Sequence, residues 1–253
     1  MTVTAEHLTS FREDGYCVIR GLIPPEVCDA VRLRVLETLE DPPEWSTRAW
    51  QVIDPERYTA AAGHPIPGGI QGPAHNEEVF REMATHPNLE AAMHDLLGGE
   101  VTLFTDQIGV KQGFITEEQG GCSFFHQDSY YWHIDPALGS NCWIPMQPVG
   151  KDAIALAMMP GSQRDWELKD HEQYFDDPPM GGYGNDTFSA FQRHRIPADQ
   201  VDFSREMLVP METGDALFFT NYTWHRSEPN RTGETMMFYG IAYQRQVEAA
   251  SGS

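Results

Sequence analysis

The first residues with the types and spacing for chemistry are His126 and Asp128, in the aromatic-rich stretch GCSFFHQDSYYW at residues 121–132. Side chains two residues apart on a β-strand project from the same face, so the imidazole and the carboxylate would meet while Gln127 turns away. Imidazole nitrogens and carboxylate oxygens both bind divalent transition metals. The pair therefore predicts half of a metal site.

The His-x-Asp spacing alone is weakly specific, because His133 and Asp135 repeat it just before Pro136, where a strand end or turn is expected. A third ligand must come from elsewhere. In GDALFFTNYTWHRSEPNRTGE, His225 ends a long apolar run and precedes a polar loop, which makes it the best candidate. Two histidines and one aspartate leave three positions of an octahedral Fe(II) open, as a chelating co-substrate and dioxygen would require.

The elements that must hold these residues change character near residue 100. From there on, short runs rich in aromatic and β-branched residues alternate with glycine and proline, a pattern typical of a β-sandwich or barrel. Before it, apolar spacing predicts helices within residues 4–13, 24–41 and 76–99 and a strand at 16–23. The predicted fold class is mainly β with flanking helices (α+β), the helices packing on one sheet.

The chain of 253 residues is predicted to form a single domain over residues 1–253, because all-β domains of this length are common. Its parts would be an N-terminal helical part at about 1–99, a β-rich core at about 100–245 and an insertion at about 164–200. The insertion has little periodicity. A long irregular insertion in a compact domain is typical of a lid over a functional site.

The charge balance restricts the class of partner. The chain has 38 acidic and 17 basic residues, a formal net charge of -21. Such a chain repels phosphate backbones and anionic lipids, which argues against nucleic acid and membrane partners and leaves a small-molecule substrate. The acidity either keeps the protein in solution or forms an acidic pocket for a cationic substrate.

Cysteine spacing and hydropathy indicate the compartment. Neither a CxxC metal motif nor a compact disulfide framework is formed by the four cysteines, so we expect reduced, partly buried thiols at Cys17, Cys28, Cys122 and Cys142. The first residues, MTVTAEHLTSFREDG, lack the basic and apolar parts of a secretory leader, and no run approaches 18 apolar residues. These features predict a cytoplasmic protein.

Four blocks of the sequence together resemble a known family. In chain order they are FREDGYCVIRGLIPPEVCDAVR, FFHQDSYYW, NCWIPMQPVGKDAIALAMMPGSQR and GDALFFTNYTWHRSEPNRTGE. They resemble the phytanoyl-CoA dioxygenase family of Fe(II) and 2-oxoglutarate dependent oxygenases, from about residue 10 to 245 with the insertion excluded. The resemblance implies a double-stranded β-helix core, a cupin-like jelly roll. It further implies that His126, Asp128 and His225 hold Fe(II), with 2-oxoglutarate as co-substrate and O2 as oxidant.

The resemblance also assigns the 2-oxoglutarate pocket, with one departure. Asn141 and Trp143 would lie on the strand that lines the pocket. Family members usually have an arginine about eleven residues beyond the second histidine to pair with the far carboxylate of 2-oxoglutarate, and this chain has Met236 there. An arginine fork suits that task because it meets a carboxylate bidentately. The substitutes are Arg231 and, on an earlier strand, Lys111.

Two groups of residues are candidates for substrate contact. Tyr130 and Trp132 follow the predicted ligands directly, and their rings either form core or touch substrate. Asp152 and Asp177, near the expected mouth of the site, would either receive ammonium groups or belong to a solvated acidic loop.

The leading hypothesis is a dioxygenase that oxidises a small polar metabolite, cationic on the charge argument, such as an aminosugar or amino acid derivative of a biosynthetic pathway. Related halogenases carry a small residue in place of the aspartate ligand, so Asp128 favours hydroxylation, desaturation or oxidative ring closure. The acidity argues against a CoA thioester. One alternative is a non-catalytic jelly-roll protein that binds a metal or ligand. Another is a zinc-dependent lyase or hydrolase that uses the same three ligands.

Overall fold

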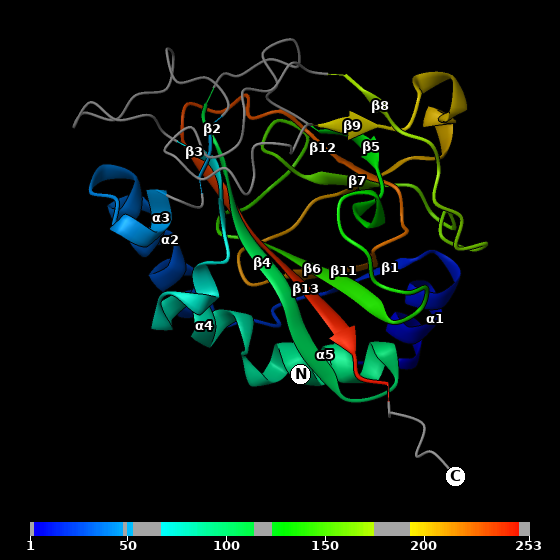
Figure 1. The fold of residues 1–253 in the computed structure, drawn as a ribbon, viewed down its shortest axis with the longest axis horizontal. Helices are drawn as coiled ribbons and strands as arrows, with labels where there is room; N and C mark the ends of the chain where they lie inside the picture. Colours follow the sequence, from blue (N-terminus) through cyan, green and yellow to red (C-terminus); the bar gives the residue numbers. More distant parts are fainter. Residues whose placement is uncertain (1–2, 48–49, 53–66, 114–122, 175–192, 248–253) are drawn as a thin grey trace.

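Helices occupy much of the first hundred residues, and antiparallel strands are the main regular elements after them (Figure 1). The computed structural model describes residues 3–47, 50–52, 67–113, 123–174 and 193–247.

A large antiparallel sheet forms the centre of the molecule. Within the described ranges it has seven strands in the order β1-β11-β6-β13-β4-β3-β2. Their bounds, in that order, are Tyr16–Ile19, Ala216–Thr220, Gly139–Pro145, Met236–Arg245, Val101–Lys111, Pro67–Gln71 and Trp50–Val52. The region predicted as helical therefore contributes three strands, which extend both edges of the sheet.

A smaller sheet lies over one face of the large one. It has the order β10-β7-β12-β5 among the described residues, with bounds Met207–Val209, Leu156–Met158, His225–Ser227 and Ser123–His126. Side chains of both sheets share one apolar cluster, to which the large sheet gives Trp143, Leu217 and Met236 and the small sheet gives Leu156 and Met158. Two facing antiparallel sheets around a shared interior confirm the predicted jelly-roll class.

A pair of short strands joins the ends of the predicted insertion. β8 (Glu172–Gln173) pairs with β9 (His194–Arg195), and the backbone N–H of Ile196 donates to Phe125 O at 2.7 Å. The ends of the insertion are thereby attached beside β5. Its residues 175–192 lie outside the described part of the chain, so the predicted lid stays a prediction.

Helices cover the face of the large sheet that the small sheet leaves open (Figure 1). Among the described residues they are α1 to α5, with bounds Ala5–Glu13, Pro25–Glu40, Glu44–Thr47, Glu78–Ala84 and Pro87–Leu97. Short 3-10 helices span Pro73–His75, Asp128–Tyr130, Ala198–Gln200 and Phe203–Arg205. No helix in these ranges is both long and apolar enough to cross a membrane.

Local signals explain why the predicted helices form where they do. The Thr4 side chain accepts from the backbone N–H of His7 and caps α1, and Pro25 occupies the first position of α2. Gly98 ends α5 with φ of 72°, a left-handed conformation that glycine adopts without strain. Among the described residues the thiols of Cys17, Cys28 and Cys142 are free and buried, as predicted, and Cys122 lies outside that part of the chain.

Strand alternation separates the two interiors of the molecule. On β13, the helix-facing side chains are Met237, Tyr239, Ile241 and Tyr243. The alternate residues Met236 and Phe238 face the small sheet. The same period of two places Asn141 and Trp143 of β6 toward the small sheet, with Cys142 toward the helices. This alternation aims the predicted pocket residues into the space between the sheets.

A buried carboxylate fixes the helical layer to the sheet. Asp106 Oδ2 on β4 accepts the backbone N–H of Ala74 at 2.9 Å and the hydroxyl of Tyr239 at 2.7 Å. Burial raises the pKa of Asp106, and these hydrogen bonds oppose the rise. Asp106 therefore joins two sheet strands to the turn that leads into α4.

Replacement of Asp106 tests this role. The pKa of Asp106 is higher in the folded protein than in the unfolded chain. Asp106 therefore stabilises the fold less as the pH rises from its unfolded-state pKa through its folded-state pKa. Asp106→Asn keeps an acceptor without the charge, so we expect the unfolding free energy of the variant minus that of wild type to grow as pH rises above about 4, the ordinary pKa of an aspartate. Urea titrations at several pH values measure the difference. A flat or shrinking difference would contradict this account. Asp106→Leu, which removes the acceptor, should cost about 1–3 kcal/mol.

Candidate metal centre

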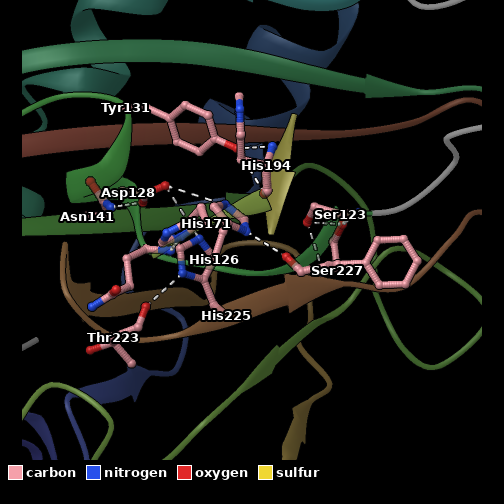
Figure 2. A network of polar contacts seen from close by, with 12 residues as sticks. Ser123, His126, Asp128, Tyr131, Asn141, His171, His194, Thr223, His225 and Ser227 are labelled. Atoms are coloured by element: carbon pink, nitrogen blue, oxygen red, sulfur yellow. Dashed lines mark hydrogen bonds and ion pairs between the residues drawn. The ribbon is translucent and has the colours of Figure 1, made fainter. Parts of the chain in front are cut away.

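Three side chains converge at one end of the space between the sheets (Figure 2). His126 ends β5 and His225 begins β12, and the two residues are register partners across these strands. Asp128 begins the short helix Asp128–Tyr130. Its Oδ1 lies 3.6 Å from Nε2 of each histidine, and one donor atom from each residue lies within 4.8 Å of the others. The three predicted ligands are therefore brought together.

The spacing argument holds even though Asp128 lies just outside the strand. Gln127 has φ of -118° and ψ of 133°, an extended conformation, so the residues on either side of it still project to one face.

Backbone carbonyls set the tautomer of both histidines. His126 Nδ1 lies 2.8 Å from Phe124 O, and His225 Nδ1 lies 3.0 Å from Thr223 O. A carbonyl oxygen only accepts, so each Nδ1 carries the proton and each Nε2 offers its lone pair to the shared point. Partners of this kind orient metal-binding histidines in general.

Burial sets the protonation states of the three groups. It lowers the pKa of His126 and of His225 to about 4 and raises the pKa of Asp128 to about 6. At neutral pH the group therefore consists of two neutral imidazoles and one carboxylate. These are the states in which histidine and aspartate bind a metal ion.

Asn141 holds the carboxylate from the large sheet. Its Nδ2 donates to Asp128 Oδ2, so the other oxygen of Asp128, Oδ1, faces the two histidines (Figure 2). Its register partner on β11 is Phe219, whose ring centroid lies 4.5 Å from that of His225. One strand therefore positions the acidic ligand, and the next supports a histidine ring.

The residue between the first two candidate ligands is a structural connector. The Gln127 side chain is fully buried; its Nε2 donates to Glu167 O at 2.8 Å and Tyr222 O at 2.9 Å, and its Oε1 accepts from Lys169 N at 2.8 Å. Its backbone N–H donates to His171 Nε2 at 3.1 Å. Sequence reasoning placed this residue facing away from the site but gave no signal for these partners, which lie 40 or more residues away.

A polar group lies further along the same inner face. Ser227, two residues beyond the last candidate ligand on β12, accepts from Lys111 Nζ at 2.6 Å and from Ser123 N at 3.0 Å. Lys111 Nζ also donates to Glu228 O at 3.3 Å. Lys111 and Met236 are register partners on β4 and β13. The ammonium group of Lys111, which the sequence suggested as a substitute for the arginine, therefore lies between the two sheets. Its partner Ser227 was not among the predicted site residues.

Two aromatic rings of the large sheet line the space between the sheets, at strand positions between those of Asn141 and Met236. Trp143 stacks on Phe238, with ring centroids 5.1 Å apart and an interplanar angle of 28°. A Cβ on Gly109, the register partner of Phe238, would lie 2.0 Å from that ring, so only glycine leaves room for it. Trp143 Nε1 is buried and has no hydrogen-bond partner among the described residues. Buried donors without partners are rare, and this one fits a pocket for an acceptor.

The other predicted anchor lies at the surface. Arg231 is 48% exposed, and its guanidinium lies 3.6 Å from a carboxylate oxygen of Glu228 and 3.9 Å from one of Asp152. Asp152 is 71% exposed. The structure therefore pairs these two predicted site residues with each other, outside the space between the sheets.

Aromatic residues lie beside the three ligands on the side of the insertion. The Tyr131 ring is 5.9 Å from that of His126, and its hydroxyl accepts the N–H of His194 at 2.8 Å and donates to His194 O at 3.1 Å. The Tyr130 ring is partly exposed and stacks on His171 at 4.2 Å. No sequence pattern placed His171 and His194 near the site, because both belong to the predicted insertion at about 164–200.

The remaining predicted substrate residues are less central. Trp132 packs against Phe104 of β4, with ring centroids 5.4 Å apart. Asp177 lies outside the described residues.

Comparison with known proteins identifies the family. Residues 11–236 match the model of the family Phytanoyl-CoA dioxygenase (PhyH). The peroxisomal phytanoyl-CoA dioxygenase of Rattus norvegicus is 25% identical over 245 residues, which cover 91% of this chain and 65% of the rat protein. The chain therefore spans slightly less than two thirds of the length of this relative.

Solved structures show the same fold. EctD from S. alaskensis in its apoform superimposes with a TM-score of 0.71 at 16% identity, over 96% of this chain and 77% of EctD. The epimerase SnoN, in complex with Fe3+, alpha ketoglutarate and nogalamycin RO, gives a TM-score of 0.65 at 16% identity, over 98% of this chain and 91% of SnoN. The matched residues include the whole small sheet and every strand of the large sheet except β13, which begins at the last matched residue. The chain belongs to the phytanoyl-CoA dioxygenase family.

Proposed function

We propose that the protein is an Fe(II) and 2-oxoglutarate dependent dioxygenase. The observation that carries the proposal is the convergence of His126, Asp128 and His225 on one point, with two neutral imidazole nitrogens and one carboxylate oxygen. Two histidines and one carboxylate form a facial set that leaves positions open on iron. Family membership supports the same assignment.

The remaining residues fit the co-substrate. Trp143 offers a buried N–H without a partner, and Ser227 and Lys111 place a hydroxyl and an ammonium group further along the inner face. Such donors suit the carboxylates of 2-oxoglutarate, which need partners when they leave water. SnoN, which has the same fold, binds alpha ketoglutarate and Fe3+.

When bound, iron and 2-oxoglutarate would supply the oxidation of a substrate C–H bond by O2, with succinate and CO2 as co-products. The part of the protein is placement. Asn141 fixes the orientation of the Asp128 carboxylate, and the backbone carbonyls keep both Nε2 atoms unprotonated. Asp128 also occupies the position that a halide ligand would need, which favours hydroxylation, desaturation or oxidative ring closure.

For the substrate we propose a small polar, cationic metabolite, such as an aminosugar or amino acid derivative of a biosynthetic pathway. The net charge of -21 supports a cation over a CoA thioester with its phosphates. The partly exposed Tyr130 ring, which extends the aromatic group next to His126, supports the same class, because aromatic faces attract cations.

Metal binding tests the ligand set. We expect His225→Ala to abolish Fe(II) binding in anaerobic titration calorimetry in chloride-free buffer. Asp128→Ala should weaken it because one ligand is lost, and Asn141→Ala should weaken it about 10–100-fold because the carboxylate loses its support. His133→Ala is the matched control: this histidine has the same His-x-Asp spacing but is 69% exposed. Equal metal affinity in wild type and His225→Ala would refute the site.

Turnover tests the class of protein. The Fe(II) protein with 2-oxoglutarate under argon should show a weak visible charge-transfer band, and admission of O2 should convert 2-oxoglutarate to succinate. His225→Ala should show neither, because the iron is lost. Bound iron without a band or succinate would favour a non-catalytic binding protein. Activity with Zn(II) and no oxygen consumption would favour a lyase or hydrolase.

Substrate class is tested on the anaerobic Fe(II) and 2-oxoglutarate complex. A compound that binds next to the metal perturbs the charge-transfer band, so a panel of aminosugars, amino acid derivatives, polyamines and CoA thioesters separates the classes. We expect the cationic compounds to shift the band. A shift with CoA thioesters alone would contradict the charge argument.

A further inference from the structure

The far carboxylate of 2-oxoglutarate needs a cation, and the position that supplies one in the family is apolar here. Met236 is 4% exposed and belongs to the apolar cluster between the sheets. A carboxylate that leaves water without a charged or hydrogen-bonding partner is strongly destabilised. If this chain binds 2-oxoglutarate, another residue must replace the arginine.

Two nearby arginines already form ion pairs with acidic residues outside the space between the sheets. Arg226 alternates with the inward residues of β12; its guanidinium binds Glu206 at 2.8 and 3.0 Å and Glu228 at 2.9 Å. Arg231 is half exposed and lies near Glu228 and Asp152. Neither points its charge into the space between the sheets.

Lys111 reaches the same place from the neighbouring strand. It is the register partner of Met236, so its backbone lies directly across from the position of the family arginine. Its Nζ donates to Ser227 Oγ at 2.6 Å. Ser227 and the ligand His225 are two residues apart on one face of β12, a step of about 6.5 Å along a strand.

This step matches the length of the co-substrate. Three covalent bonds separate the keto carbon of 2-oxoglutarate from its far carboxyl carbon, a span of about 3.8 Å in an extended chain. With one metal–oxygen bond and one hydrogen bond added at the ends, the molecule is long enough to reach from a metal ion on His225 to donors that lie one such step along β12. Trp143 and Phe238 form an apolar wall beside this path.

We propose that Lys111 of β4 anchors the far carboxylate of 2-oxoglutarate, in place of the arginine that the family carries on β13. Ser227 shares the contact through its hydroxyl, and Met236 fills the volume that the arginine side chain would occupy. This inference rests on the proposed function, since it concerns the same co-substrate.

Ligand affinity tests the proposal without turnover. The charge-transfer band of the anaerobic Fe(II) protein is titrated with 2-oxoglutarate and with 2-oxopentanoate, which has the same five carbons but no far carboxylate. We expect wild type to bind 2-oxoglutarate at least about tenfold more tightly, equivalent to about 1.4 kcal/mol. Lys111→Met should remove this preference, while 2-oxopentanoate affinity stays within about twofold.

The controls separate an anchor from a structural residue. Arg231→Met, a change of the same kind at the competing cation, should leave both affinities unchanged, and Fe(II) affinity should be equal in all three proteins. Equal weakening of both ligands in Lys111→Met, or a preference that persists there, would overturn the proposal. Loss of the preference in Arg231→Met instead would assign the anchor to Arg231. A wild type that binds iron but neither ligand would refute the proposed function itself.

A second measurement needs no variant. The chain has three lysines, Lys111, Lys151 and Lys169, so acetylation by acetic anhydride followed by mass spectrometry reports on each. Saturating 2-oxoglutarate with Fe(II) should slow the acetylation of Lys111 at least about threefold and leave the other two unchanged, because only Lys111 would be covered. Equal labelling of Lys111 with and without 2-oxoglutarate would contradict the anchor.

Discussion

The antiparallel pairing of His225 with His126 is the constraint on which the site depends. Backbone hydrogen bonds between β12 and β5 set the distance between the two rings, and the carbonyls two residues upstream set their tautomer. A slip of one strand by one residue in this register would turn one of the two imidazoles to the opposite face of the sheet, away from the other. The larger sheet and its helical layer serve this pairing, because they supply the apolar interior against which the small sheet is held.

A second consequence of the architecture is electrostatic. Burial disfavours the charge of Asp128 and disfavours protonation of both histidines, so without a cation the three groups form a costly arrangement. A divalent ion removes that cost. The site is therefore arranged for its ligand in advance, and Asn141 holds the one carboxylate oxygen that faces away from the histidines.

Local signals made part of this structure predictable. Caps and apolar spacing placed α1, α2 and α5, and the period of two placed the ligand pair around Gln127. Strands β2 and β3 were missed, because a sequence such as PGGIQ has little strand propensity and is ordered by its neighbour β4. The contact of Lys111 with Ser227 spans 116 residues and depends on strand register, so the sequence favoured Arg231 as the substitute and offered Lys111 only as a second possibility.

Gln127 is one of the contacts, together with the stack of Tyr130 on His171, between the site and the segment around Glu167 and His171. Its side chain and backbone bind the segment around Glu167 and His171, while its neighbours in the chain are two of the three ligands. Any equilibrium in which that segment detaches must also alter the peptide between His126 and Asp128. By thermodynamic reciprocity, an ion that favours the attached arrangement stabilises the segment, and a molecule that orders the segment tightens the hold on the ion by the same factor. The segment around Glu167 and His171 and the three candidate ligands are in this way linked through one residue.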